Sequence, residues 1–122
     1  MSHIVRIQTQ VRDEAAVFAA CHRRQLAAPV HGKHRLYSGE VVGLAVLLRE
    51  WHYPAVCRIE TGEVVYDNFG GRWGEQGELD LFMQAYAVEK ARIEARKRGH
   101  TVTEQSLGDG SIRLTVQVGG AA

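Results

Sequence analysis

The chain has 122 residues, of which 45% are hydrophobic and 24% are charged. This length suits one domain with a single core, and this composition excludes a wholly disordered chain. The formal net charge of +1 with neutral histidines argues against a nucleic-acid partner. The N-terminal residues lack the apolar stretch of a signal peptide, and no apolar run is long enough to span a bilayer. We therefore expect a cytoplasmic protein that does not enter a membrane.

The first third of the chain predicts a strand, a helix and a second strand. Residues 3–11 alternate between apolar and polar side chains, which is typical of a half-buried strand. A helix is expected from residue 14 to about residue 27, with Asp13 as its N-cap. Residues 30–40 suggest a loop with room for a short strand at 35–37. The nearly all-apolar residues 41–48 predict a strand that is central in the sheet or covered on both faces.

The middle of the chain predicts a β-hairpin followed by a loop. Residues 55–60 and 63–68 are short strand-forming runs, and the Thr61-Gly62 pair between them is a hairpin signal. Residues 68–74 are rich in glycine and are expected to connect this hairpin to the next helix.

A long helix and a second hairpin complete the chain. The helix is expected from residue 77 or 78 to residue 98, and Gly99 suits the position just after a helix end. The closing hairpin is expected to pair residues 101–105 with residues 112–118. Alternation in its second strand predicts that one set of side chains faces the core: Ile112, Leu114, Val116 and Val118.

The expected order of elements is β-α-β-β-β-α-β-β, which places the protein in the α+β class. Because hairpins join most of the strands, we expect a largely antiparallel sheet with two helices on one face. A ferredoxin-like core with added strands is the arrangement that fits this order best. Residues 1–118 are expected to form this single domain, and residues 119–122 a disordered C-terminal tail.

Four segments of the chain resemble a small ycf-type family, named from hypothetical open reading frames of chloroplast genomes. They are SHIVRIQTQ, VYDNFGGRW, QAYAVEKARIEARKRGHTV and DGSIRLTVQV. The family has cyanobacterial and other bacterial relatives, and its domain has no established function. The resemblance implies no reaction, cofactor or catalytic residue, but it does imply an AAA-class ATPase as a partner. The chain departs from the family at residues 68–74, where other members carry an acidic and aromatic segment.

The loop at residues 68–74 is the best candidate for a recognition surface. Its glycines allow another molecule to approach the backbone closely, and its aromatic and arginine side chains are enriched at interaction hot spots. The alternative is a strand-to-helix connection whose aromatic rings plug the edge of the sheet. Two aromatic residues from another connection are expected to lie nearby. The binding candidates are Asn68, Phe69, Gly70, Gly71, Arg72 and Trp73, with Trp51 and Tyr53 as neighbours.

Other residues give weaker signals for a functional site. The six histidines show no zinc-binding pattern, so we expect no metal site or other cofactor. Glu75 and Glu78 could act as paired carboxylates, but acidic residues at a helix start more simply complement the helix dipole. Cys57 could be a nucleophile, but no base is placed beside it by any recognisable pattern.

The leading hypothesis is therefore a cytosolic binding or adaptor domain that acts through a protein partner or as a homo-oligomer. The first alternative is a regulatory domain that binds a small ligand or a nucleotide, because loops of an α+β sheet can form such a site. The weaker alternative is a small enzyme that uses Cys57 or the pair Glu75 and Glu78.

Overall fold

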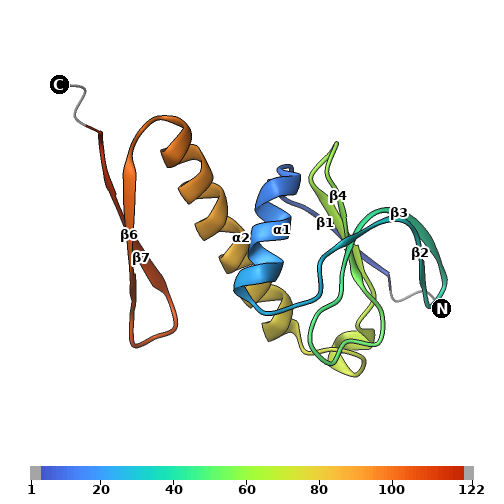
Figure 1. Ribbon diagram of the computed structural model, residues 1–122. Helices are drawn as coiled ribbons and strands as arrows, with labels where there is room; N and C mark the ends of the chain where they lie inside the picture. The colour runs from blue at the N-terminus through green and yellow to red at the C-terminus, as the bar shows by residue number, and fades with distance from the viewer. Residues whose placement is uncertain (1–3, 120–122) are drawn as a thin grey trace.

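The computed structural model describes residues 4–119 and has a five-stranded sheet, two α-helices and a separate two-stranded ribbon (Figure 1). Strands and helices follow one another in an order that contains one more strand than expected. The elements are β1 (Val5–Gln8), α1 (Glu14–Arg23), β2 (Val30–Leu36), β3 (Gly39–Val46), β4 (Ala55–Arg58), β5 (Glu63–Tyr66), the short 3₁₀ turn η1 (Phe69–Gly71), α2 (Gln76–Lys97), β6 (Thr101–Ser106) and β7 (Ile112–Gln117).

The main sheet is antiparallel throughout, with the strand order β1-β5-β4-β3-β2. Both helices lie on one side of it, between the sheet and the ribbon of β6 and β7 (Figure 1). The α+β class and the antiparallel sheet are therefore confirmed. Of the tail expected at residues 119–122, residues 120–122 lie outside the described residues.

The expected ferredoxin-like core does not form. In that core the strand after the second helix would join the main sheet, whereas β6 pairs only with β7 in a sheet of its own. Strand β6 instead lies on the side of the helices away from the main sheet (Figure 1), where Glu104 pairs with Arg23 of α1 and Arg92 of α2. The chain then turns back at Gly110, where φ is +89°, and returns as β7, the partner of β6. The Asp109 carboxylate accepts hydrogen bonds from the backbone N–H and the hydroxyl of Ser111, which closes this turn.

The ribbon packs less deeply than the alternation of its second strand suggested. Ile112 and Leu114 are partly buried, but Val116 is 46% exposed and Val118 is 74% exposed. The prediction that all four residues face the core is thus wrong for Val116 and Val118. The alternation does place them on one face, but that face is partly covered only at Ile112 and Leu114.

The two helices begin and end where their sequence signals indicate, with one exception. The Asp13 side chain accepts a hydrogen bond from the N–H of Ala16 and caps α1. Helix α2 ends at Lys97 and is followed by Gly99 with φ of +74°. Helix α1 ends at Arg23 rather than near residue 27, because Gln25 adopts a φ of +59° that a helix cannot continue through.

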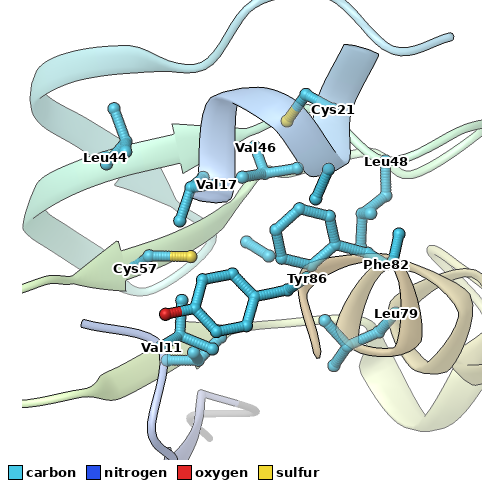
Figure 2. Packing of buried hydrophobic residues seen from close by; sticks show 14 of the residues in the cluster. Val11, Val17, Cys21, Leu44, Val46, Leu48, Cys57, Leu79, Phe82 and Tyr86 are labelled. Carbon is cyan, nitrogen blue, oxygen red and sulfur yellow. The ribbon is translucent and has the colours of Figure 1, made fainter. Parts of the chain in front are cut away.

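The main core lies between the helices and the sheet (Figure 2). Helix α1 contributes Val17 and Cys21, helix α2 contributes Leu79 and Phe82, and the sheet contributes residues of β3, β4 and β5. Each of these four helical side chains is at most 1% exposed. Burial on this scale is the main source of stability for a domain of this size.

A second apolar cluster lies on the far face of the sheet, where no helix covers it. Its buried members come from β2, β3, β4 and β5: Leu36, Val41, Ala45, Val56 and Val65. The hairpin of β2 and β3 curls over this face, and its tip approaches Ile4, the residue before β1: a Cβ at Gly39 would lie 3.8 Å from Cδ1 of Ile4. Strand β3 is consequently covered on both faces at Leu44, Ala45 and Val46, as its apolar run predicted.

Candidate functional site

The loop between β5 and α2 has a tightly wound backbone. Phe69, Gly70 and Gly71 have φ of +48°, +61° and +98°, three successive residues in the left-handed region. Glycine adopts such angles without strain, but a phenylalanine does so only when its surroundings hold it there. The carbonyl oxygen of Asn68 accepts hydrogen bonds from the N–H groups of Gly71 and Trp73, both at 2.9 Å. These hydrogen bonds fix the conformation of the loop and the positions of Phe69 and Trp73 on it.

Trp73 is the centre of a cluster of aromatic rings. The Phe69 ring stacks on it with centroids 4.6 Å apart. The rings of Tyr37, Tyr53 and His52 approach it from two other connections, at 5.0, 5.6 and 6.2 Å. We call these five residues, together with Arg72, the aromatic surface.

The aromatic surface is partly open to solvent. Tyr37 is 55% exposed, and Tyr53, Phe69 and Trp73 are intermediate between buried and exposed. The guanidinium carbon of Arg72 lies 5.2 Å from the centre of the Phe69 ring, a cation–π contact. The rings are thus neither fully buried plugs nor freely exposed side chains, and they present edges and faces that another molecule could cover.

The predicted neighbours of the loop have different positions. Tyr53 packs edge-on against Trp73, as part of the aromatic surface. Trp51 instead joins the main core, where its ring lies 5.6 Å from that of Tyr66 and its Nε1–H donates to the carbonyl oxygen of Glu75 at 3.0 Å. A Cβ at Gly74 would overlap the Trp51 ring, so a glycine is needed there for the close packing. Trp51 supports the loop from behind.

Sequence reasoning missed Tyr37, whose exposed ring belongs to the aromatic surface. It lies at the tip of the hairpin of β2 and β3, and the curl of that hairpin over the far face brings it to Trp73. No local sequence pattern predicts a contact between residues 37 and 73, which are far apart in the chain. The only sequence signal is a tyrosine near a turn-forming glycine.

Buried polar groups hold the base of the loop. Asp67 is fully buried, and its Oδ1 accepts a hydrogen bond from the N–H of Phe69 at 3.3 Å. Its Oδ2 has no hydrogen-bond partner among the described residues. The Asn68 amide and the Tyr66 hydroxyl both reach Oε1 of Gln76, at 3.4 and 3.5 Å. These contacts tie the loop to the first turn of α2.

The acidic residues at the start of α2 are engaged in structure. The Glu78 carboxylate lies 3.7 Å from Arg24 and 3.8 Å from Arg49, so it links α2 to the two connections beside it. Glu75 contributes its carbonyl oxygen to Trp51. Both residues line a polar hollow of about 300 Å³. The Glu78 carboxylate is thus engaged with two arginines from neighbouring segments.

The two cysteines lie in the main core (Figure 2). Burial raises the pKa of Cys21 to about 11 and is the main cause that raises the pKa of Cys57 to about 12. A thiol must lose its proton to act as a nucleophile. Near neutral pH both thiols are therefore held in the protonated form.

A groove of about 570 Å³ lies between the β1–α1 connection and α2, lined among others by Val11, Met83 and Ala87. Three of its charged side chains pair with one another, because Lys90 lies 2.9 Å from both Asp13 and Glu94. The hydrogen bonds to these carboxylates, first that to Glu94, raise the pKa of Lys90. These three groups are thus already paired within the chain.

Among residues 4–119, no group of three histidine, cysteine, aspartate or glutamate side chains is arranged to hold a metal ion. In the same part of the chain, neither helix combines the length and apolar character needed to cross a membrane. Comparison of the chain with protein-family models, with curated proteins and with solved structures finds no match.

Proposed function

We propose that the protein is a binding module that recognises a protein partner through the aromatic surface. The observation that carries this proposal is the convergence of four rings on Trp73 from three separate connections, at a site that remains partly exposed. Tryptophan, tyrosine and arginine are enriched among the residues that contribute most to binding at protein interfaces. Aromatic rings also bury a large area on binding.

The shape of the surface also supports a protein partner. The loop is held by backbone hydrogen bonds to Asn68 and by the buried Asp67, so its rings are ordered before a partner arrives. Such ordering reduces the entropy lost on binding. The resemblance to the ycf-type family makes an AAA-class ATPase of the same organism the first candidate to test.

The test compares single alanine variants of Phe69 and Trp73 with Phe18→Ala. Phe18 is a matched control because it is a phenylalanine that is 40% exposed on α1, outside the aromatic surface. A partner captured from the native host is purified, and its affinity for each variant is measured by calorimetry. Loss of either ring at the aromatic surface should weaken binding by at least about 1 kcal/mol, roughly fivefold, with the fold intact. Phe18→Ala should bind normally.

Two results would count against the proposal. If Phe69→Ala and Trp73→Ala unfold the protein, the rings serve the core rather than a partner. If both variants stay folded and bind as tightly as Phe18→Ala, recognition takes place elsewhere on the molecule. Circular dichroism melts of all three variants separate these cases.

A small ligand in the groove beside α2 is the second candidate function, favoured by the volume and apolar lining of that groove. A ligand that fills it should raise the melting temperature of the protein, since binding to the native state stabilises it. A panel of nucleotides and small apolar acids, measured by thermal shift, tests this. Ala87→Trp, which would fill the groove, should abolish any shift that is found.

A further inference from the structure

The ribbon of β6 and β7 has two unpaired edges in the described part of the chain. The main sheet protects its own edges from other strands: β1 is only four residues long, and β2 carries Lys33 and Arg35. The ribbon has less protection of this kind, since Arg113 is the only charged residue of β7. A two-stranded ribbon is also marginally stable unless further strands or a helix support it.

The two edges of the ribbon differ in how they are held. Strand β6 is tied to both helices by Glu104, whose carboxylate lies 2.7 Å from Arg23 of α1 and 2.8 Å from Arg92 of α2. No ion pair involves β7 in the residues that the structure describes. The outer edge of β7 is therefore the better candidate for pairing with another chain.

The hydrogen-bond pattern of the ribbon shows which groups β7 offers at that edge. The N–H of Leu107 donates to the carbonyl oxygen of Ser111 at 2.9 Å, so residues 107 and 111 form a bonded pair. Bonded and non-bonded pairs alternate along an antiparallel ladder. The next bonded pairs are then 105 with 113 and 103 with 115. It follows that the N–H and C=O groups of Ile112, Leu114 and Val116 point outward.

We propose that the outer edge of β7 pairs antiparallel with β7 of a second copy of this chain. With Thr115 on the two-fold axis, the outward groups of Leu114 meet those of Val116 of the partner subunit, and those of Ile112 meet Val118 of the partner subunit. A two-fold axis makes every such contact occur twice, so one strand serves as both surfaces. The pairing joins two ribbons into a four-stranded sheet.

Side-chain chemistry favours this register. It brings Ile112 and Leu114 beside the two valines that the monomer leaves 46% and 74% exposed, Val116 and Val118. It also sets Arg113 opposite Gln117 of the partner subunit, so no like charges face each other. An axis at Arg113 would instead place two arginines directly opposite, which is destabilising.

The expected dimer is concentration-dependent. Pairing of one short strand buries less area than the roughly 1,200–2,000 Å² of a stable protein interface. The proposal is independent of the aromatic surface, which lies on connections outside the ribbon, so the failure of one would leave the other standing.

Disulfide trapping of the full chain tests the register directly. In the proposed dimer, position 115 faces its own copy as a non-bonded pair with Cα atoms about 4.5 Å apart, which is within reach of a disulfide. Thr115→Cys should therefore form a covalent dimer under mild oxidation, seen on a non-reducing gel. Thr103→Cys is the matched control. It is also an exposed threonine on the same face of the ribbon, but three strand spacings, about 14 Å, would separate it from its copy. The native cysteines are buried and give little background.

A second pair of variants, measured by sedimentation equilibrium, tests whether the dimer forms through the edge of β7 or that of β6. Val116→Pro removes an outward N–H of β7 and should abolish the dimer, whereas Ser106→Pro removes an outward N–H of β6 and should leave it. The proposal is overturned if the wild-type chain stays monomeric up to millimolar concentration. It is also overturned if Thr103→Cys crosslinks in preference to Thr115→Cys, or if only Ser106→Pro blocks association.

Discussion

Replacing Tyr86 by phenylalanine should destabilise the protein although it removes a single oxygen atom. The Tyr86 side chain is 5% exposed, and its hydroxyl joins α2 to the connection between β1 and α1 (Figure 2). It accepts hydrogen bonds from the N–H groups of Arg12 and Asp13, both at 3.1 Å, and donates to the carbonyl oxygen of Gln10 at 3.2 Å. A hydroxyl can accept two hydrogen bonds and donate one, so the Tyr86 hydroxyl makes every hydrogen bond that it can.

The size of the effect follows from what remains after the oxygen is removed. Each hydrogen bond contributes about 0.5–1.5 kcal/mol net, but the N–H of Arg12 keeps a second acceptor, the carbonyl oxygen of Gln10 at 2.9 Å. Water can also enter from the groove that these residues line. We therefore expect a loss of about 1–3 kcal/mol, which corresponds to a fall of roughly 4–12 °C in melting temperature for a chain of this length.

Urea unfolding followed by circular dichroism measures this loss, with Tyr66→Phe as the matched control. Tyr66 is equally buried, at 6% exposed, but its hydroxyl makes one long hydrogen bond to Gln76 at 3.5 Å. The control should lose less than about 1 kcal/mol. Equal effects of the two substitutions would show that the Tyr86 hydroxyl does not hold the connection in place.

Gly62→Ala should lower the free energy of unfolding by more than about 2 kcal/mol, because φ is +80° and the new Cβ would overlap the Thr9 carbonyl oxygen. Gly110 has a similar φ of +89° but open space around it. Gly110→Ala should therefore lower the free energy of unfolding by only about 1 kcal/mol in the same urea assay. Glu104→Gln should speed amide exchange throughout the ribbon at neutral pH. The hydrogen bond from Arg23 holds the pKa of Glu104 below its ordinary 4.5, so in the wild type this support is present above pH 4.5 and is lost as pH falls through the lowered pKa. Acid should therefore loosen the wild-type ribbon but change the Glu104→Gln ribbon little.

Local signals predicted most of the elements correctly. The apolar run at residues 41–48 became β3 (Gly39–Val46), the Thr61-Gly62 pair marks the turn between β4 and β5, and Gly99 follows the end of α2. These features depend on neighbouring residues, through backbone conformation and periodic burial. They can therefore be recognised without knowledge of the rest of the chain.

The structure departs from prediction where distant segments decide the outcome. The sequence predicts mainly a loop where β2 forms, because residues 30–40 show no apolar alternation. In the structure His31, Lys33 and Arg35 are exposed on an edge strand, so no buried face produces such a pattern. The position of the closing hairpin depends on contacts with both helices through Glu104, which no alternation reveals. The sequence indicates the part of the aromatic surface that lies on the loop of Phe69 and Trp73. It does not indicate Tyr37, whose contact with Trp73 depends on the curl of a hairpin over the sheet.

Helix α2 separates the aromatic surface from the ribbon of β6 and β7. Its 22 residues make a rod of about 33 Å, with the Trp73 loop just before its first turn and the ribbon beginning just after its last. A dimer joined through the ribbons would carry one copy of the aromatic surface on each subunit. A partner with a single site would then bind each copy separately, whereas an assembly with repeated subunits could engage both at once. The second contact would be intramolecular, so avidity rather than the strength of one contact would select a multimeric partner.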